Sequence, residues 1–368
     1  MYGFESFYFL FFLLYLLYGI LIDSNIVGKK VKIMVLFLPL FLLAALRGDT
    51  VGGDLSNYLP VFDAASHVTK FKHLMWISNT EPGLKILDYI INQFSSTHRA
   101  FLICTSIISL IGPAYLIYRY SRNPLFSILL YYSLGFYTNT FNNVRQAIAM
   151  SICFFAVPYI FDRKVWKFLI IALFAFCFHY SALIFFGLYP IVRYVHNLKS
   201  IFVLFFGGVL LFWGSKHIIM EFIANSMLVR YNPESILDST GGWGLFVLYL
   251  LILVVEILLY YIKISKLNVT IKQRALFFIS LQSLSVIIQM YATMWGSMTR
   301  ATHYFFILGI LAIPFFISLY KEKEQKIYYA FILILTMFFM SKVYSYNQNT
   351  RSNSQGVIPY VFLDVQLF

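Results

Sequence analysis

The chain has 368 residues, of which 60% are hydrophobic, 20% aromatic and only 12% charged. A soluble domain cannot cover that much apolar surface, whereas a bundle of transmembrane helices requires it. The formal net charge of +13 is spread over short loops and forms no basic face, which argues against a nucleic-acid partner.

Apolar runs that are long enough to cross a membrane, about 17–25 residues each, follow one another along the chain. They lie near 4–22, 30–46, 100–118, 124–141, 145–161, 167–192, 200–219, 243–262, 275–294, 302–320 and 327–343. The first run has neither a basic n-region nor a cleavage site, so we expect a retained helix and no removable signal peptide. The sequence predicts an all-α polytopic integral membrane protein with about 11–12 transmembrane helices, in a single domain over residues 1–368.

The orientation of these helices follows from the basic loops, because Lys and Arg accumulate on the cytoplasmic side. Five clusters mark that side: 29–32, 119–122, 163–167, 263–274 and 321–326. With these inside, the N-terminus, the stretch 47–99, the turn 139–145, the loop 220–242 and the C-terminal tail lie outside.

One segment, 167–192, does not fit this assignment, because basic residues precede it and Arg193 and Lys199 follow it. A helix from Lys167 to Phe178 rises only about 18 Å, which is short for a full crossing. We therefore predict that the segment breaks near His179–Ser181 and turns back, with its exposed backbone lining a polar cavity. The alternative is one ordinary helix with Arg193 tolerated outside.

Two outer loops have features of their own. Residues 82–95 form an amphipathic helix with apolar side chains at 84, 87, 91 and 94, which we expect to lie along the outer interface. Its opposite face carries Lys85, Asp88 and Asn92. The loop 220–242 ends in two glycines and is a candidate mobile lid.

Three arginines, Arg47, Arg145 and Arg300, stand at the outer edges of apolar segments, against the usual charge bias. The planar guanidinium fork suits phosphate and carboxylate groups. An outward-facing membrane protein with several such forks is expected to handle an anionic, lipid-linked substrate.

The polar motifs around two of these arginines suggest anion binding. In the stretch 47–58, glycines allow close approach to an anion, and Asp54 and Tyr58 share a helix face. The alternative there is a tight loop with a structural Arg–Asp pair. Near Arg145, Asn143 and Gln146 open a helix whose free N–H groups favour anions. The alternative is a pair of helix caps with a snorkelling arginine.

The remaining motifs supply a base and a further cation. His179 lies at the expected break and could act as general base or neutral donor, although a lone histidine is more often a core residue. Arg300 and Tyr304 stand one turn apart on one face, which also fits an interfacial belt pair. The sequence shows no metal-ligand spacing, so neither metal nor cofactor is implied.

Taken in order, these segments resemble the EpsG-like family of polysaccharide polymerases, which is grouped with the Wzy O-antigen polymerases. The resemblance rests on Arg47 to Tyr58, Glu81-Pro82-Gly83, Asn143 to Gln146, Phe178 to Ile184, Arg300 to Phe305 and Ile358-Pro359-Tyr360. One departure is Leu55, where the family more often has a tyrosine after the aspartate.

The resemblance implies a glycosyltransferase of the bacterial inner membrane with its active site toward the periplasm. It would move glycan from undecaprenyl diphosphate to the end of a new lipid-linked repeat unit. Arg145, Arg300 and Arg47 would then bind diphosphate, and His179, Asp54 or Glu81 would serve as general base, with His179 the first choice. A lipid-linked oligosaccharide flippase and an O-antigen ligase are the alternatives. The sequence leaves open the sugars, the oligomeric state and whether a chain-length regulator takes part.

Overall fold

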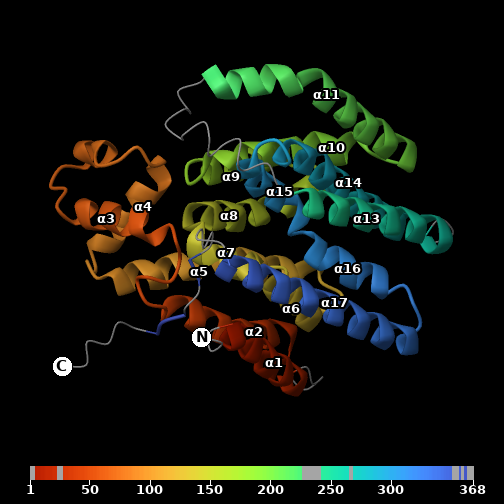
Figure 1. Ribbon diagram of the computed structural model, residues 1–368, viewed down its shortest axis with the longest axis horizontal. Helices are drawn as coiled ribbons and strands as arrows, with labels where there is room; N and C mark the ends of the chain where they lie inside the picture. Colours follow the sequence, from red (N-terminus) through yellow and green to blue (C-terminus); the bar gives the residue numbers. More distant parts are fainter. Residues whose placement is uncertain are drawn as a thin grey trace. The chain divides into compact units, whose positions relative to one another are not determined.

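The computed structural model of the protein describes residues 5–22, 28–225, 242–264, 268–349, 356–357 and 360–362 (Figure 1). Regular structure in these residues is helical, apart from one isolated bridge between Arg47 and Phe362. Six described helices are long and apolar enough to cross a membrane, and three shorter apolar helices accompany them. The predicted all-α polytopic membrane fold is therefore confirmed, whereas the count of 11–12 spans stays a prediction.

The chain forms two compact units, Met1–Leu183 with Tyr320–Phe368, and Ile184–Leu319, and each is described by itself. Whether the chain functions as one domain stays a prediction. The helices of the first unit are α1 (Glu5–Ile22), α2 (Lys29–Ala45), α3 (Leu55–Ser66), η1 (Phe71–Trp76), α4 (Pro82–Asn92), α5 (His98–Tyr120), α6 (Pro124–Ser133), α7 (Phe136–Asn142), α8 (Val144–Phe161), α9 (Val165–Phe176) and α17 (Glu322–Asn349). Helix η2 (Tyr180–Gly187) continues from the first unit into the second.

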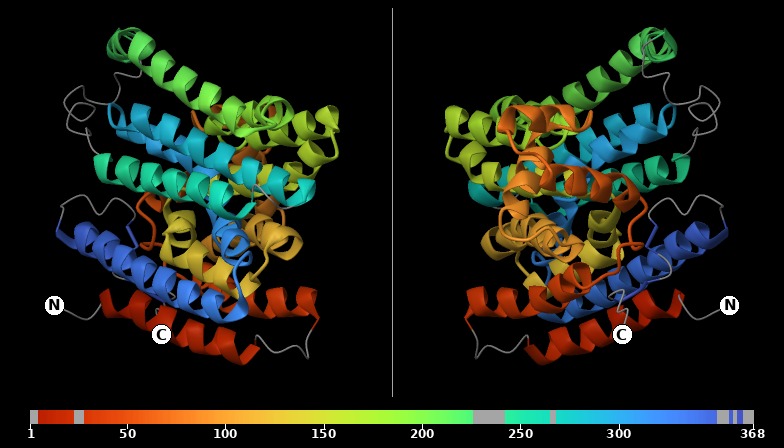
Figure 2. Two further views of the ribbon diagram at one scale, coloured as in Figure 1. Left: turned by 90° about the vertical axis from the view of Figure 1, so that its right-hand side faces the viewer. Right: turned by 90° about the vertical axis from the view of Figure 1, so that its left-hand side faces the viewer.

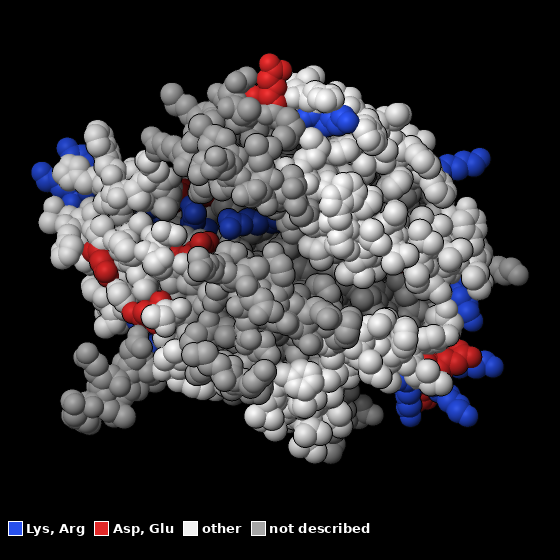
Figure 3. Space-filling model, in the orientation of Figure 1, with Lys and Arg blue, Asp and Glu red and all other residues white. Residues whose placement is uncertain are grey.

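The first unit is built on a row of helices in which α2 packs on α5, α5 on α8, and α8 on α9 (Figures 1 and 2). Helix α6 packs against α1 and α17, while α3 and α4 pack on each other and on α5. Figure 3 shows small groups of charged side chains separated by wide uncharged surface, as expected of helices that face lipid.

The crossing of α5 and α8 depends on a glycine and an inserted hydroxyl. A Cβ on Gly112 would lie 2.3 Å from the Ser151 carbonyl oxygen, so only glycine allows this approach. The Ser151 hydroxyl accepts from the Gly112 amide at 2.9 Å and donates to the Ile108 carbonyl at 2.5 Å. It thereby enters the backbone ladder of α5 beside Pro113, where the helix already lacks one N–H.

Tyrosine hydroxyls satisfy carbonyls in α2, which contains Pro39. Because proline has no N–H, the Val35 carbonyl loses its helical donor. Tyr18 donates to that carbonyl at 2.8 Å, and Tyr15 donates to the Leu36 carbonyl at 2.6 Å. Such bonds tie α1 to α2.

The second unit is arranged around α14 (Val269–Ala292), on which other helices of this unit pack. Its remaining elements are α10 (Leu188–Tyr194), α11 (Leu198–Asn225), α13 (Trp243–Leu259), η4 (Tyr260–Ile264), η5 (Gly296–Met298), α15 (Thr299–Phe306) and α16 (Gly309–Ile317). The predicted loop 220–242, apart from the end of α11 and from Gly242, lies outside the described residues, and so does its proposed role as a lid.

The expected break near His179 is confirmed, because α9 ends at Phe176 and a 3-10 helix begins at Tyr180. The predicted reversal of direction stays a prediction. The prediction of one uninterrupted helix over 124–141 is wrong, because Gly135, with a φ of 79°, separates α6 from α7. Glycine adopts this left-handed conformation without a steric penalty.

The predicted polar face of the 82–95 helix is also wrong. Helix α4 forms over Pro82–Asn92, but Lys85 and Asp88 are buried, whereas Ile90 and Phe94 are exposed. The Lys85 ammonium donates to the carbonyls of Met75 and Ser78, at 2.8 and 3.1 Å. The packing of η1 and α3 thus takes up the polar face, and an interfacial location of α4 stays a prediction.

We predict that Gly112→Val destabilises the protein, because a branched side chain must displace the Ser151 backbone. Overpacking of this kind costs about 1–3 kcal/mol. A lowered midpoint of thermal unfolding in detergent would show it. Gly207→Val in α11 is the control, since no atom lies near its Cβ position. Equal midpoints for the two variants would contradict the role of the α5–α8 crossing.

Candidate functional site

Three residues from distant parts of the first unit meet at one buried carboxylate. Glu81, which precedes α4, is 3% exposed. Its Oε1 lies 2.8 Å from Nδ1 of His179, and its Oε2 forms an ion pair with Nη1 of Arg145 in the first turn of α8. We call these residues, with Tyr58 and Asp54, the Glu81 site.

A close approach between α4 and the end of α9 brings Glu81 to His179. The Gly83 amide donates to the Cys177 carbonyl at 2.8 Å. A Cβ on Gly83 would lie 2.7 Å from that oxygen and 2.9 Å from the Phe178 ring, so a larger residue cannot occupy this position without movement. Pro82 suits the first helical position because its missing N–H is not needed there. The Glu-Pro-Gly and Phe-His-Tyr-Ser motifs therefore form one contact.

The contacts of Glu81 keep it ionised. Burial acts to raise its pKa, but the hydrogen bond with His179 and the Arg145 charge outweigh burial, and the pKa falls to about 2. The Tyr180 amide adds a bond to Oε1 at 3.4 Å. An ionised carboxylate accepts the proton of Nδ1, which leaves Nε2 of His179 with a free lone pair. Glu81 therefore orients the imidazole and is itself a poor base.

Arg145 is held from its other side by α3. Its guanidinium carbon lies 5.3 Å from the centre of the Tyr58 ring. The Tyr58 hydroxyl donates to Oδ2 of Asp54 at 3.4 Å, and the Asp54 amide donates to Oδ1 of Asn142 at 2.8 Å. Asp54 and Tyr58 are thus one turn apart on one helix face, as predicted.

The Arg145 guanidinium retains an unused donor. Its Nε is buried and meets no hydrogen-bond acceptor among the described residues. A buried donor without a partner is rare in proteins and calls for an explanation. The side chain as a whole is 26% exposed, so its accessible part, unlike the buried Nε, can meet an external acceptor.

The other predicted residues of the α8 entry are buried in protein. Asn143 donates from Nδ2 to Oδ1 of Asn139 at 2.6 Å, and Gln146 is 1% exposed. Asn143 immediately precedes α8, and Gln146 follows Arg145 in its first turn. Their predicted roles in substrate binding stay predictions.

Arg47 has a different setting from the one expected for a diphosphate ligand. Its side chain is buried and donates to the carbonyls of Ala44 and Val51 and to the Ser106 hydroxyl. Its guanidinium carbon also lies 4.8 Å from the centre of the Phe141 ring. These contacts fasten the end of α2, so the structure gives Arg47 a structural environment and does not join it to the Glu81 site.

Arg300 and Tyr304 belong to the second unit. Both are in α15, where Arg300 is exposed and Tyr304 is fully buried, with its ring 6.5 Å from that of Phe185. The predicted role of Tyr304 in substrate binding stays a prediction. The role of Arg300 as a diphosphate ligand stays a prediction as well.

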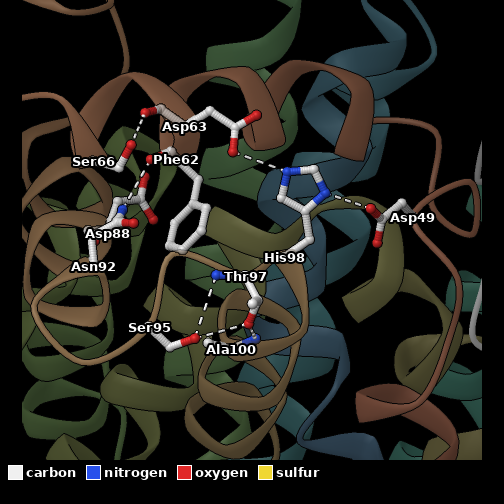
Figure 4. A network of polar contacts seen from close by, with 10 residues as sticks. All are labelled: Asp49, Phe62, Asp63, Ser66, Asp88, Asn92, Ser95, Thr97, His98 and Ala100. Atoms are coloured by element: carbon white, nitrogen blue, oxygen red, sulfur yellow. Dashed lines mark hydrogen bonds and ion pairs between the residues drawn. The ribbon is translucent and has the colours of Figure 1, made fainter.

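Sequence reasoning missed a second polar cluster, which Figure 4 shows. His98, the first residue of α5, bridges two carboxylates, with Nδ1 2.5 Å from Asp49 and Nε2 3.0 Å from Asp63. The available signal was that all three residues fall in the stretch 47–99, the longest polar region of the sequence. No group of three or more His, Cys, Asp or Glu side chains in the described part of the chain is arranged to hold a metal ion.

Comparison with known proteins gives one finding. A model of the EpsG family matches residues 30–362, a stretch that includes every residue of the Glu81 site. The curated proteins and the solved structures give no match.

Asp88, a buried residue of α4, leads to a prediction about pH. Burial raises its pKa from 3.8 to about 8, and neither carboxylate oxygen has a hydrogen-bond partner among the described residues. The folded protein therefore keeps a proton that the unfolded chain loses, so its free energy of unfolding decreases as pH rises from about 4 to 8. Asp88→Asn should remove this dependence.

Thermal midpoints of wild type and Asp88→Asn at pH 5 and pH 8 test this expectation. The variant should be stabilised relative to wild type at pH 8 more than at pH 5. Asp162→Asn, an exposed aspartate, is the control. A difference that is constant with pH would show that Asp88 is not protonated in the folded protein.

Proposed function

The chain belongs to the EpsG family, and on this premise we propose that it is a bacterial inner-membrane polymerase of lipid-linked glycan repeat units. We propose further that the substrates are carried on undecaprenyl diphosphate, as for O-antigen, and that the site opens toward the periplasm. The observation that carries the proposal is the Glu81 carboxylate, which holds a guanidinium and an imidazole at one place. These are the two groups that such a transfer needs.

In the proposed reaction a sugar hydroxyl of the new repeat unit attacks the anomeric carbon of the donor chain. The new bond joins that oxygen to the anomeric carbon, and the bond from this carbon to the diphosphate oxygen breaks. Undecaprenyl diphosphate leaves with the electron pair, and the hydroxyl proton passes to a base. The protein must therefore stabilise charge on the leaving oxygen and accept one proton.

Arg145 suits the first task. The partial exposure of its side chain supports the binding of a diphosphate oxygen, while Glu81 and Tyr58 hold the guanidinium in place. A preorganised cation at the leaving oxygen lowers the barrier without reorganisation during the reaction. The proposed mechanism uses no metal ion.

His179 suits the second task. Its Nδ1 is engaged by Glu81, so Nε2 is the atom that would take the hydroxyl proton. The carboxylate then stabilises the imidazolium that forms, as the aspartate does in catalytic triads. Among the three base candidates from the sequence, this geometry favours His179.

We predict that Arg145→Ala lowers the rate of polymer formation by about 10²–10³-fold, the usual effect of losing one charge-stabilising donor. Arg145→Lys should recover only part of the rate, because it keeps the charge and loses the fork. The measurement is chain growth from purified lipid-linked repeat units by the protein in nanodiscs. In cells, the lipopolysaccharide ladder should collapse to single repeat units.

Two controls separate chemistry from folding. Arg122→Ala removes an exposed arginine and should keep full activity. Because Arg145→Ala leaves a buried carboxylate without its cation, the double variant with Glu81→Gln removes both charges and should fold better while staying inactive. Long chains in Arg145→Ala would refute the role of Arg145, and complete chains that merely fail to reach the lipid core would favour a ligase.

We also predict that His179 and Glu81 act as one unit. His179→Ala should lower the rate by about 10²–10⁴-fold, the range for a lost general base. Glu81→Gln should lower it because the imidazole loses its orientation, and the double variant should be no slower than His179→Ala. Single-turnover rates in nanodiscs measure all three, with His67→Ala, an exposed histidine, as control. Additive losses would mean that the two residues act separately.

A further inference from the structure

We propose that the C-terminal strap, residues 356–357 and 360–362, is a positioning element of the active site. The strap is hydrogen-bonded to the loop 47–54. That loop ends at Asp54, which accepts a hydrogen bond from Tyr58, and the Tyr58 ring contacts Arg145. This inference rests on the proposed function, because its readout is the transfer rate.

Backbone hydrogen bonds join the strap to the loop. The Gly48 amide donates to the Val361 carbonyl and the Gly52 amide donates to the Gly356 carbonyl, both at 2.7 Å. Arg47 and Phe362 form the antiparallel bridge between them. A Cβ on Gly356, whose φ is 58°, would lie 2.2 Å from the Gly53 amide nitrogen. The two segments are therefore in contact along their backbones.

Side chains anchor the strap to the helices behind it. The Tyr360 hydroxyl donates to the Leu43 carbonyl at 2.6 Å, at the end of α2, and its ring stacks on Phe7 at 4.8 Å between centres. The Tyr8 hydroxyl donates to the Val357 carbonyl at 2.8 Å. Val357 is fully buried and Tyr360 is 7% exposed. The strap is thus fixed to α1 and α2 before it meets the loop.

The loop 47–54 is connected to Arg145 through a series of contacts. A Cβ on Gly52, whose φ is 121°, would lie 2.2 Å from the Phe141 carbonyl oxygen, so the loop lies tightly on α7. The Asp54 amide is bonded to Asn142, and Asp54 accepts from Tyr58, whose ring lies under the Arg145 guanidinium. The strap, the loop, Tyr58 and Arg145 therefore form one series of contacts.

The composition of the loop explains why it needs an external partner. Glycines at 48, 52 and 53 give it many accessible conformations, and ordering them costs conformational entropy. Without the strap, the Gly48 and Gly52 amides lose their acceptors. Asp54 and Tyr58 would then sample positions that leave Arg145 misplaced, and small displacements of this kind can reduce a rate by about 10²-fold.

The test weakens the contact between the strap and the loop by one substitution and then restores this contact with a disulfide. Gly356→Val should lower kcat about tenfold or more, leave KM for the acceptor unchanged, and speed amide exchange in residues 47–58. Gly28→Val is the matched control, because no atom lies near its Cβ position and its backbone is ordinary. In the Gly356→Val protein, the further substitutions Gly48→Cys and Val361→Cys introduce a disulfide between the loop and the strap, which we call the lock. A Cβ on Gly48 would lie 3.4 Å from the Val361 Cβ, close to the separation found in disulfides.

Oxidation of the lock should return both kcat and the amide exchange rate of residues 47–58 to their wild-type values. Addition of a reductant should reverse both effects. Faster exchange with kcat within about twofold of wild type would overturn the proposal, because the loop would then move without affecting the site. Restored exchange without restored kcat would overturn it as well. An inactive wild-type protein would refute the proposed function instead, so the two failures are distinguishable.

Discussion

The buried carboxylate of Glu81 constrains the rest of the first unit. A charge removed from water is tolerated only when it is paired and hydrogen-bonded. Glu81 obtains its partners from segments that are far apart in the chain, Arg145 at the start of α8 and His179 after α9. The fold must therefore bring together the starts of α4 and α8 and the end of α9, and Gly83 makes the last of these approaches possible.

The same pairing sets the charge of the site through the reaction that we propose. Before transfer, the charges of the guanidinium and the carboxylate compensate each other, and the proposed base is a neutral imidazole. When the base takes a proton, it becomes an imidazolium beside Glu81 as negative charge grows on the leaving oxygen. The positive charge thus appears together with the negative charge that it offsets, which is how a preorganised site favours the transition state.

Sequence reasoning captured what depends on local pattern. Apolar run length located the helices, and the basic flanks of 167–192 exposed a break at His179 that hydropathy alone does not reveal. It could not find the Glu81–Arg145 pair, because the two residues are 64 positions apart and no local rule joins them. Lys85 and Asp88 were assigned to the polar face of the helix, and helical periodicity cannot tell whether water or α3 will cover that face.

Arg47 and Arg145 gave the same signal in the sequence, and their positions on the helices explain why the structure treats them differently. Arg47 follows the C-terminus of α2, where free carbonyls carry partial negative charge and accept its N–H groups. Arg145 lies in the first turn of α8, where the backbone offers only donors and the helix dipole opposes a cation. An arginine there must take its partners from elsewhere, and Glu81 supplies one without using Nε. Arg300 likewise stands in the first turn of its helix, α15, and is exposed. Helix position therefore separates Arg47, which completes the fold, from Arg145, whose Nε meets no acceptor among the described residues. An anion-binding role of Arg300 stays a prediction.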